Sequence, residues 1–475
     1  MTDISREASI RVVPVALPGD ILALTGEAVA PVRGILGQPT GLYYLAATEA
    51  WERFSYYGMT ALVVLYMVNQ LLLPGHVENI AGFAGFRAAL ESVFGPMSTQ
   101  ALASQIFGLY SGFVYFTPML GGWIADRFIG PRNAVVTGAL LMSGGHLAMA
   151  FDRSFLIALA LLILGSGLLK GNISAQVGAL YAVDDEANRV RAYTVFSMAI
   201  NVGAVLGPLV CGLLAQLYGW HTGFGAAALF IMIGLVTYLA GYRHLPAHVA
   251  RTASVSRALT SAEWRRIRAI CAVLAIVVLP ATSYLQCMNT AAVWVQDHVN
   301  LDLVGFVIPV PWFNAVDAGF SILGVPVVFA LWHWQADRRA GVEPGDLEKI
   351  GLGGWLVASA NLILVAAIVA LGDDGLSPIW PFLYFAMMGF SFLFYWPVTL
   401  ALVSRAAPAP VNATMMGVAF LALFVGSNIM GRLGGLYGVL SPATFWGLHA
   451  AVAAAGSVAV LMFGDAITRA LRTDV

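Results

Sequence analysis

Residues 49–54 read Glu-Ala-Trp-Glu-Arg-Phe and lie inside a segment, residues 41–73, that is otherwise apolar enough to span a membrane. Charged side chains at the centre of such a helix cost at least about 2.5–3.5 kcal/mol each, so they usually face a wet cavity and have partners. On a helix Glu49 and Glu52 share a face, with Arg53 adjacent. The base lowers the cost of burying the acids and leaves a carboxyl group that can take up and release a proton.

The composition is that of a polytopic membrane protein. Of the 475 residues, 59% are hydrophobic and only 10% are charged, whereas soluble domains are about one quarter charged. The net charge of −1 disfavours a nucleic-acid partner. Cys211, Cys271 and Cys287 all lie in apolar segments, which predicts neither a disulfide nor a metal site. No nucleotide-hydrolysing motif is found, so active transport must draw on a gradient, and no cofactor is expected.

Hydropathy predicts an all-α membrane protein with twelve spans, because about 20 mostly apolar residues are needed to cross about 30 Å of hydrocarbon. The loop at residues 74–100 is long and has room for a short amphipathic helix, and residues 243–266 are too short and too polar to add a helix pair between the halves. The predicted spans are residues 43–72, 101–125, 133–151, 155–181, 192–217, 221–242, 267–294, 305–334, 350–372, 379–404, 411–437 and 443–468.

The twelve spans divide into two six-helix bundles, residues 41–242 and residues 267–475, joined by a cytoplasmic linker at residues 243–266 and preceded by a tail at residues 1–40. Arginines gather in alternate loops, in the linker and in both tails, which predicts cytoplasmic N- and C-termini. Two bundles with a site between them near the midplane of the lipid bilayer are typical of secondary transporters. We expect a monomer in a bacterial inner membrane, without a cleavable signal peptide.

Residues 122–132 read Gly-Trp-Ile-Ala-Asp-Arg-Phe-Ile-Gly-Pro-Arg and follow the second predicted span. The segment resembles the loop motif of the major facilitator superfamily. Glycine permits close helix approach, and Asp126 and Arg127 can latch neighbouring helix ends in one state. The alternative is an ordinary turn with positive-inside charge.

Residues 49–58, Glu-Ala-Trp-Glu-Arg-Phe-Ser-Tyr-Tyr-Gly, resemble the first-helix signature of the proton-dependent oligopeptide transporter family. Weaker matches follow in the family's order over nearly the whole chain, at residues 165–174, 200–203, 311–314, 405–408 and from 416 onward. The resemblance implies a divergent member with the major facilitator fold and proton-coupled uptake of di- or tripeptides, so its partner is a small molecule.

Lys170 stands out without the resemblance. The chain has only two lysines, and the other, Lys349, is expected in a loop. Lys170 lies about fifteen residues into its span, too central for its side chain to reach the membrane surface. Its ammonium can hold a substrate carboxylate, or pair with Glu49 or Glu52 when the site is empty, and the resemblance implies both roles.

The resemblance also implies which residues bind the substrate. The tyrosines and asparagines are expected to hydrogen-bond the peptide backbone and its amino end, although packing and interhelical hydrogen bonds are the alternative roles. The proton-coupling residues are expected to be Glu49, Glu52, Arg53, Lys170 and Asp317. The substrate-binding residues are expected to be Arg53, Tyr56, Tyr57, Tyr115, Lys170, Asn201, Gln286, Trp312, Asn314, Asp317 and Phe392.

The chain departs from the family pattern in and around this site. Thr60 and Leu285 replace an arginine and a glutamate that form a gate in other members, and losing both charges together leaves none unpaired. Phe392 replaces the tenth-helix glutamate that binds the substrate's ammonium. Ala419 replaces a pocket tryptophan, and Ser197 a tyrosine.

Asp317 is a candidate to compensate for the missing tenth-helix acid. It follows Asn314 by three residues, shares its helix face, and is the only acid in the body of its span. It could bind a cationic group or carry a second proton, and a structural pair or an acid near the membrane surface is the alternative.

Three other functions stay open on the sequence. The loss of the tenth-helix acid also fits a modified or N-blocked peptide, a peptide-like metabolite or an organic anion. An intramembrane enzyme would need paired catalytic groups, and His146 and His449 lack an obvious nucleophile. A receptor of transporter ancestry would bind the substrate without moving it.

Overall fold

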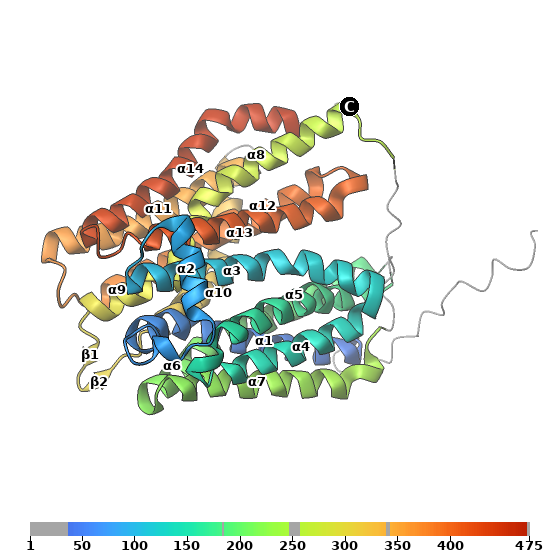
Figure 1. Cartoon of the computed structure of the whole chain (residues 1–475). Coiled ribbons are helices and arrows are strands. Elements are labelled where there is room, and N and C mark those ends of the chain that lie inside the picture. The colour runs from blue at the N-terminus through green and yellow to red at the C-terminus, as the bar shows by residue number, and fades with distance from the viewer. Residues whose placement is uncertain (1–36, 183–184, 247–256, 339–342, 473–475) are drawn as a thin grey trace, which may run out of the picture.

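The computed structural model describes residues 37–182, 185–246, 257–338 and 343–472, and these are almost wholly helical (Figure 1). In this described part, nine helices are long and apolar enough to cross a membrane. The helices are α1 (Thr40–Tyr66), α2 (Phe83–Phe94), α3 (Thr99–Ile124), α4 (Gly130–Ala148), α5 (Phe155–Ala179), α6 (Glu186–Tyr218), α7 (Trp220–Gly241), α8 (Ser261–Tyr284), α9 (Thr290–His298), α10 (Trp312–Arg338), α11 (Asp346–Leu371), α12 (Ile379–Ala406), α13 (Asn412–Gly434) and α14 (Pro442–Leu471), and the strands are β1 (Asp302–Leu303) and β2 (Phe306–Val307).

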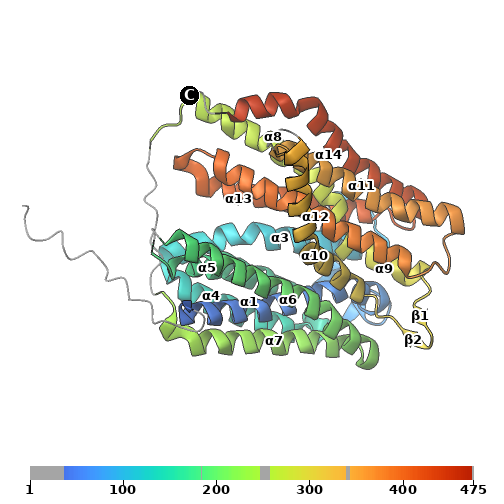
Figure 2. The ribbon, with the colours of Figure 1, turned by 180° about the vertical axis from the view of Figure 1, so that it is seen from behind.

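The helices form two groups, which we call the N-terminal group (α1–α7) and the C-terminal group (α8–α14). Each group has its own apolar core. The two groups lie one above the other in Figures 1 and 2, and meet where α3 packs on α13 and α6 on α10. A side chain at Gly108 of α3 would lie 2.8 Å from the Cα of Gly431 of α13, so glycine is what allows these two helices to touch.

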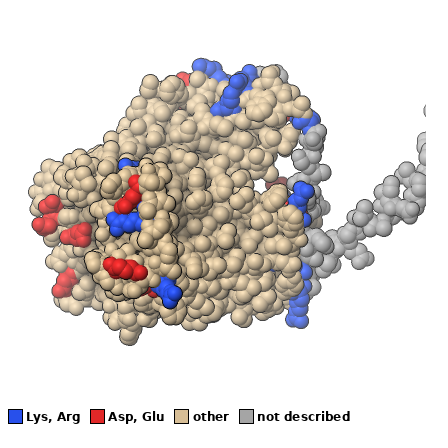
Figure 3. Space-filling view, viewed as in Figure 1, with Lys and Arg blue, Asp and Glu red and all other residues tan. Residues whose placement is uncertain are grey.

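Hydrogen bonds between the two groups gather at the end of the molecule that carries the β1–β2 hairpin. Charged side chains lie mostly at the two ends of the space-filling view, and the surface is notched between the groups at the end away from the hairpin (Figure 3). The groups are therefore joined at the hairpin end and stand apart at the other. The contacts at the hairpin end are Asn69 Nδ2 to Gln296 Oε1 (2.7 Å), Gln216 Nε2 to Val307 O (2.7 Å), Ser104 Oγ to Gly431 O (3.0 Å) and Trp312 Nε1 to Leu209 O (3.0 Å).

The loop motif after α3, residues 122–132, begins at the end of that helix. Gly121 is needed for packing, because a side chain there would lie 2.1 Å from the carbonyl oxygen of Gly167 in α5. Gly130 has φ of 76°, which favours glycine. Within the described residues Asp126 and Arg127 make no ion pair, so the latch expected from these charges is not engaged in this conformation.

Two predicted spans differ from the structure. Residues 267–294 were expected to form one helix, but a 3₁₀ turn, η7 (Leu285–Met288), separates α8 from α9, and Asn289 leaves the helical conformation with ψ of −104°. Residues 305–334 were expected to be helical, but α10 begins only at Trp312. Pro309 and Pro311 explain the delay, because the residue before a proline is disfavoured in a helix.

The predictions for three surface segments have different outcomes. The amphipathic helix expected in the first outer loop is α2, with Phe83 and Leu90 buried. The expectation that Lys349 lies in a loop is wrong, because it lies in the first turn of α11. The N-terminal tail lies outside the described residues up to residue 36, as does part of the linker at residues 247–256.

Candidate functional site

A glycine of α6 allows that helix to pack closely against the charged part of α1. A side chain at Gly203 would lie 2.5 Å from the carbonyl oxygen of Ala50 and 2.6 Å from the Cβ of Arg53. Because the two backbones touch, the α1 carboxylates are enclosed by protein, and Glu52 is 0% and Glu49 only 3% exposed. Burial to this degree is costly without compensating charge.

Arg53 supplies that compensation. Its Nε lies 2.9 Å from Oε1 of Glu49 and 2.5 Å from Oε2 of Glu52, so one cation contacts both acids. The N–H does not point at either oxygen, and Oε2 of Glu49 and both oxygens of Glu52 have no hydrogen-bond donor among the described residues. These carboxylate oxygens therefore keep free lone pairs that can accept a proton.

Lys170 of α5 lies near the same cluster. Its Nζ lies 4.1 Å from the centre of the Tyr56 ring, and the guanidinium carbon of Arg53 lies 5.6 Å from that ring. Both glutamates are within electrostatic range of Lys170, but it makes no ion pair among the described residues. Arg53 contacts both acids, and no described carboxylate forms an ion pair with Lys170, so the ammonium of Lys170 can contact an anionic group.

Tyrosines connect this cluster to the C-terminal group. Tyr115 of α3 is within electrostatic range of Tyr56 and packs against the core of the C-terminal group, and Tyr284 of α8 packs against both cores. Tyr57 is within electrostatic range of Asp317 of α10. Asn201 of α6 is partly exposed and makes no hydrogen bond with a described residue. Tyr57, Tyr115 and Tyr284 therefore lie at the junction of the two groups.

Asp317 is the acid on the far side of the junction. It is 4% exposed, and the hydroxyl of Tyr284 lies 3.3 Å from its Oδ1 and 3.1 Å from its Oδ2. Phe392 of α12 packs on Tyr284 with ring centroids 5.6 Å apart. The backbone of Asp317 touches α12 at Gly389, where a side chain would lie 2.0 Å from its carbonyl oxygen.

Three predicted binding residues of the C-terminal group lie in different surroundings: Asn314, Gln286 and Trp312. Asn314 donates to the carbonyl oxygen of Cys287 at 3.1 Å and lies one turn from Asp317. The amide of Gln286 is fully buried and contacts Met430 O at 3.1 Å and Nε2 of His449 at 2.9 Å. In this conformation Gln286 supports packing within the C-terminal group instead of facing the site.

Trp312 is also apart from the charged cluster. It donates to Leu209 at the hairpin end and lines an apolar recess of about 560 Å³ between α6 and α10. This position joins the two groups and does not place the indole beside Lys170 or Asp317. Within this site the sequence reasoning missed Tyr284, whose only signal was a phenol inside an apolar span.

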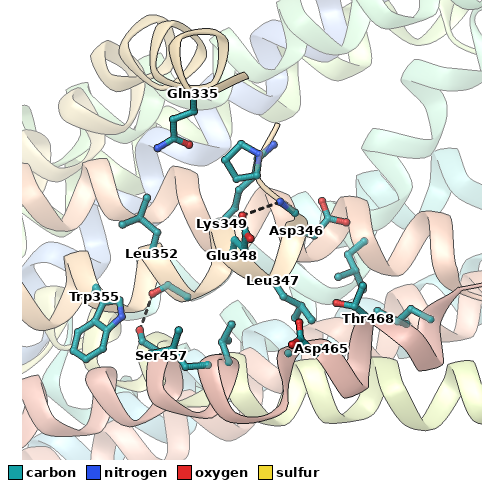
Figure 4. A pocket seen from close by; sticks show the side chains of 18 of the residues that line it. Gln335, Asp346, Leu347, Glu348, Lys349, Leu352, Trp355, Ser457, Asp465 and Thr468 are labelled. Carbon is teal, nitrogen blue, oxygen red and sulfur yellow. Dashed lines mark hydrogen bonds between the residues drawn. The ribbon is translucent and has the colours of Figure 1, made fainter. Parts of the chain in front are cut away.

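A second recess, of about 710 Å³, lies at the end away from the hairpin, between α10, α11 and α14 (Figure 4). It is lined by both charged and apolar side chains, among them Asp346, Lys349, Trp355 and Asp465. Lys349 donates to Glu343 at 2.8 Å, and this hydrogen bond lowers the pKa of the Glu343 carboxyl group. The two lysines thus differ, because Lys349 is paired with an acid and Lys170 is not.

Comparisons with known proteins agree with this geometry. The chain is 27% identical to the uncharacterized transporter YclF of Bacillus subtilis, over 93% of this chain and 97% of that protein. It is 29% identical to a di-/tripeptide transporter of Lactococcus lactis subsp. cremoris, over 81% and 87%. A crystal structure of a peptide transporter POT in complex with alafosfalin superposes with a TM-score of 0.80 at 26% identity, covering 94% of this chain and 98% of that one.

The model of the POT family matches residues 132–267 and 245–441, which together make up more than half of the chain. With the α1 signature cluster and the matching helical architecture, this identifies a multi-pass membrane transporter, and the chain belongs to the POT family.

Proposed function

We propose that this protein is a proton-coupled symporter of di- or tripeptides or peptide-like compounds. The observation that carries the proposal is the buried cluster of Glu49, Glu52 and Arg53 with Lys170 beside it, unpaired among the described residues. The cluster offers carboxylates with free lone pairs for a proton and an available ammonium for a substrate carboxylate. Relatives named as di-/tripeptide transporters, and one named as the peptide transporter YePEPT, support the substrate class.

The twelve helices of 19 or more residues in the described part of the chain support a major facilitator arrangement. Six of them (α1 and α3–α7) would form the bundle of residues 41–242, and six (α8 and α10–α14) the bundle of residues 267–475. The linker at residues 243–266 and the ends of α1 and α14 would face the cytoplasm of a bacterium, with the hairpin outside. The arginine-rich loops support this orientation in the inner membrane.

In the proposed cycle the two groups rock about the junction. In the conformation seen here they are joined at the hairpin end, and Arg53 holds both acids. Protonation of either glutamate would loosen its hold on Arg53, and substrate carboxylate would bind Lys170 and Arg53 while Tyr56, Tyr57, Tyr115, Asn201 and Asn314 bind amides. A proton entering at −100 mV supplies about 2.3 kcal/mol, enough for roughly 50-fold accumulation.

The test is uptake and counterflow in proteoliposomes against a panel of peptides and peptide-like compounds. We expect proton-driven uptake in the parent, and its loss in Glu52→Gln and Lys170→Ala. Lys349→Ala is the matched control, because it removes the other lysine from a recess that is remote from the site. Unchanged proton-driven uptake in both site variants would refute the assignment.

A second candidate function has the same transport mechanism but a different substrate. Phe392 stands where the resemblance places the acid for a substrate ammonium, which favours a modified or N-blocked peptide, a peptide-like metabolite or an organic anion. Binding of alafosfalin by a structural relative at 26% identity supports cargo other than unmodified peptides. An enzyme or a non-transporting receptor is disfavoured by membership of a transporter family and by the retained signature acids.

A further inference from the structure

The recess between α10, α11 and α14 (Figure 4) has an exposed apolar border. Two of its lining residues, Trp355 of α11 and Leu461 of α14, are 41% and 75% exposed. Met462 and Phe463 continue this exposed apolar surface along α14. Large apolar side chains exposed on membrane-spanning helices contact hydrocarbon, and tryptophan is enriched where the hydrocarbon meets the lipid head groups. The recess is therefore bordered by lipid.

A row of polar side chains lines the same recess. Asp465, Thr468 and Arg472 are spaced by three and four residues, so they share one face of α14. This helix has 30 residues and is about 45 Å long at about 1.5 Å per residue, whereas the hydrocarbon core of a membrane is about 30 Å thick. Because the row ends at Arg472, which caps the helix, it lies at the level of the lipid head groups.

One acid and one base of this row are available to a ligand. Asp346 and Lys349, which also line the recess, already have partners of opposite charge. Asp465 and Arg472 make no ion pair within the described part of the chain. The two available charges have opposite signs, which suits a zwitterion better than a simple cation or anion.

A hydrogen-bond acceptor from α10 completes the polar side of the recess. Gln335 points toward it in Figure 4, and its Oε1 is buried without a hydrogen-bond partner among the described residues. An unpaired buried acceptor costs free energy, which an N–H of a ligand would recover. A primary ammonium has three donors and suits a carboxylate and an amide oxygen together, whereas a hydroxyl and a guanidinium suit a phosphate.

We propose that this recess binds the head group of a zwitterionic phospholipid that carries a primary amine. The ammonium contacts Asp465 and Oε1 of Gln335, the phosphate contacts Thr468 and Arg472, and the acyl chains pass along the exposed apolar border. The site lies in the C-terminal group alone, so the inference goes beyond the proposed transport function and does not depend on the substrate.

The experiment is native mass spectrometry of the delipidated full-length protein with three dioleoyl lipids that share their chains and phosphate. Phosphatidylethanolamine has the charge and the N–H donors, phosphatidylcholine has the charge alone, and phosphatidylglycerol has neither. In the parent we expect the first to be retained about threefold to tenfold more than the third, the range for a few partly exposed charged contacts, with phosphatidylcholine between them.

Three variants separate the contacts. Asp465→Asn should lower the retention of both amine-bearing lipids to the level of phosphatidylglycerol. Gln335→Leu should remove only the advantage of phosphatidylethanolamine over phosphatidylcholine, and Arg472→Gln should weaken all three lipids alike. The matched controls are Asp337→Asn and Arg469→Gln, because these charges lie on α10 and α14 near the same end but do not line the recess, and they should change nothing.

Each contrary result overturns the inference for a distinct reason. Equal retention of the three lipids by the parent would mean that the row does not recognise an amine. The same losses in the control variants would mean that total charge, and not this recess, attracts the lipid. If soluble glycerophosphoethanolamine displaces the lipid at an equal concentration, the apolar border contributes nothing and the occupant is not a lipid. Since uptake is not measured, none of these results alters the proposed function.

Discussion

The charged cluster on α1 and the lone acid on α10 differ in what neutralises them. Glu49 and Glu52 are buried against Arg53, a cation of the same helix, whereas Asp317 is buried against the neutral hydroxyl of Tyr284. The first arrangement has one cation in contact with two carboxyl groups, so one of these groups can take up or release a proton. The second has no cation in contact with it within the described part of the chain, so it suits a ligand that brings one. The comparison suggests that the N-terminal group couples to protons and the C-terminal group selects the cargo.

The largest loss of stability is expected when the ion pairs of Arg53 with Glu49 and Glu52 are removed. Among the described residues, Arg53 is the only cation in contact with the two buried acids. Arg53→Ala removes it, and breaking a buried ion pair costs about 3–5 kcal/mol. We expect a large loss of folded protein, measured by the melting temperature in detergent and by the yield of monodisperse material. The triple variant Glu49→Gln, Glu52→Gln and Arg53→Met should recover stability without recovering transport. A stable Arg53→Ala protein would show that the acids do not depend on Arg53.

A smaller effect is expected where α10 touches α12. In Gly389→Ala the new methyl group would lie 2.0 Å from the carbonyl oxygen of Asp317, so the helices must separate. Overpacking of this kind costs about 1–3 kcal/mol, so the melting temperature should fall. Gly319→Ala is the control, because nothing lies within 4 Å of a side chain there. Equal melting temperatures for the two variants would contradict the close approach.

The next largest effect is expected at the Tyr56 ring, which lies near both Lys170 and Arg53. Tyr56→Leu removes the aromatic face that lies 4.1 Å from the Lys170 ammonium, a contact worth about 0.5–2 kcal/mol. Affinity for substrate in counterflow should fall about twofold to thirtyfold. Tyr56→Phe keeps the ring and separates this contribution from that of the hydroxyl. If leucine and phenylalanine have the same effect, the ring does not support Lys170.

The smallest effect is expected at the hairpin end, away from both sites. Asn69 and Gln296 exchange hydrogen bonds of 2.7 and 3.0 Å between the two groups, and each such bond contributes about 0.5–1.5 kcal/mol. Asn69→Ala should shift the population toward a conformation that is open at the hairpin end. Distances between spin labels on the two groups would measure the shift. Asn79→Ala, which loses only a local bond to Gly75, should leave the distances unchanged.

The helical architecture was largely predictable from the sequence, because long apolar runs must form helices when no water can satisfy the backbone. The break between α8 and α9 was not, since residues 285–289 lie inside a long, mostly apolar segment that predicts one continuous helix. The late start of α10 could have been predicted from Pro309 and Pro311. The span was instead placed by the hydropathy of the segment, which gives too early a start.

The α1 cluster was also predictable, because residues 49–53 are close in sequence and helix geometry alone brings them together. Lys170 was identified by an additional rule: a charged side chain at the centre of a membrane span is costly and usually has a function. The partner of Asp317 was not predictable, since Tyr284 is 33 residues away and reaches it only through the packing of α8 on the junction. The same holds for Gln286, whose buried hydrogen bonds to Met430 and His449 come from distant helices.

The most direct test of the central claim is proton entry driven by peptide, followed with a pH-sensitive dye inside proteoliposomes. The account predicts that the parent acidifies the lumen when peptide is added. At least one of Glu49→Gln and Glu52→Gln should abolish this acidification while counterflow persists within a few-fold of the parent. Acidification at the parental rate in both variants would contradict the assignment of proton coupling to the α1 cluster.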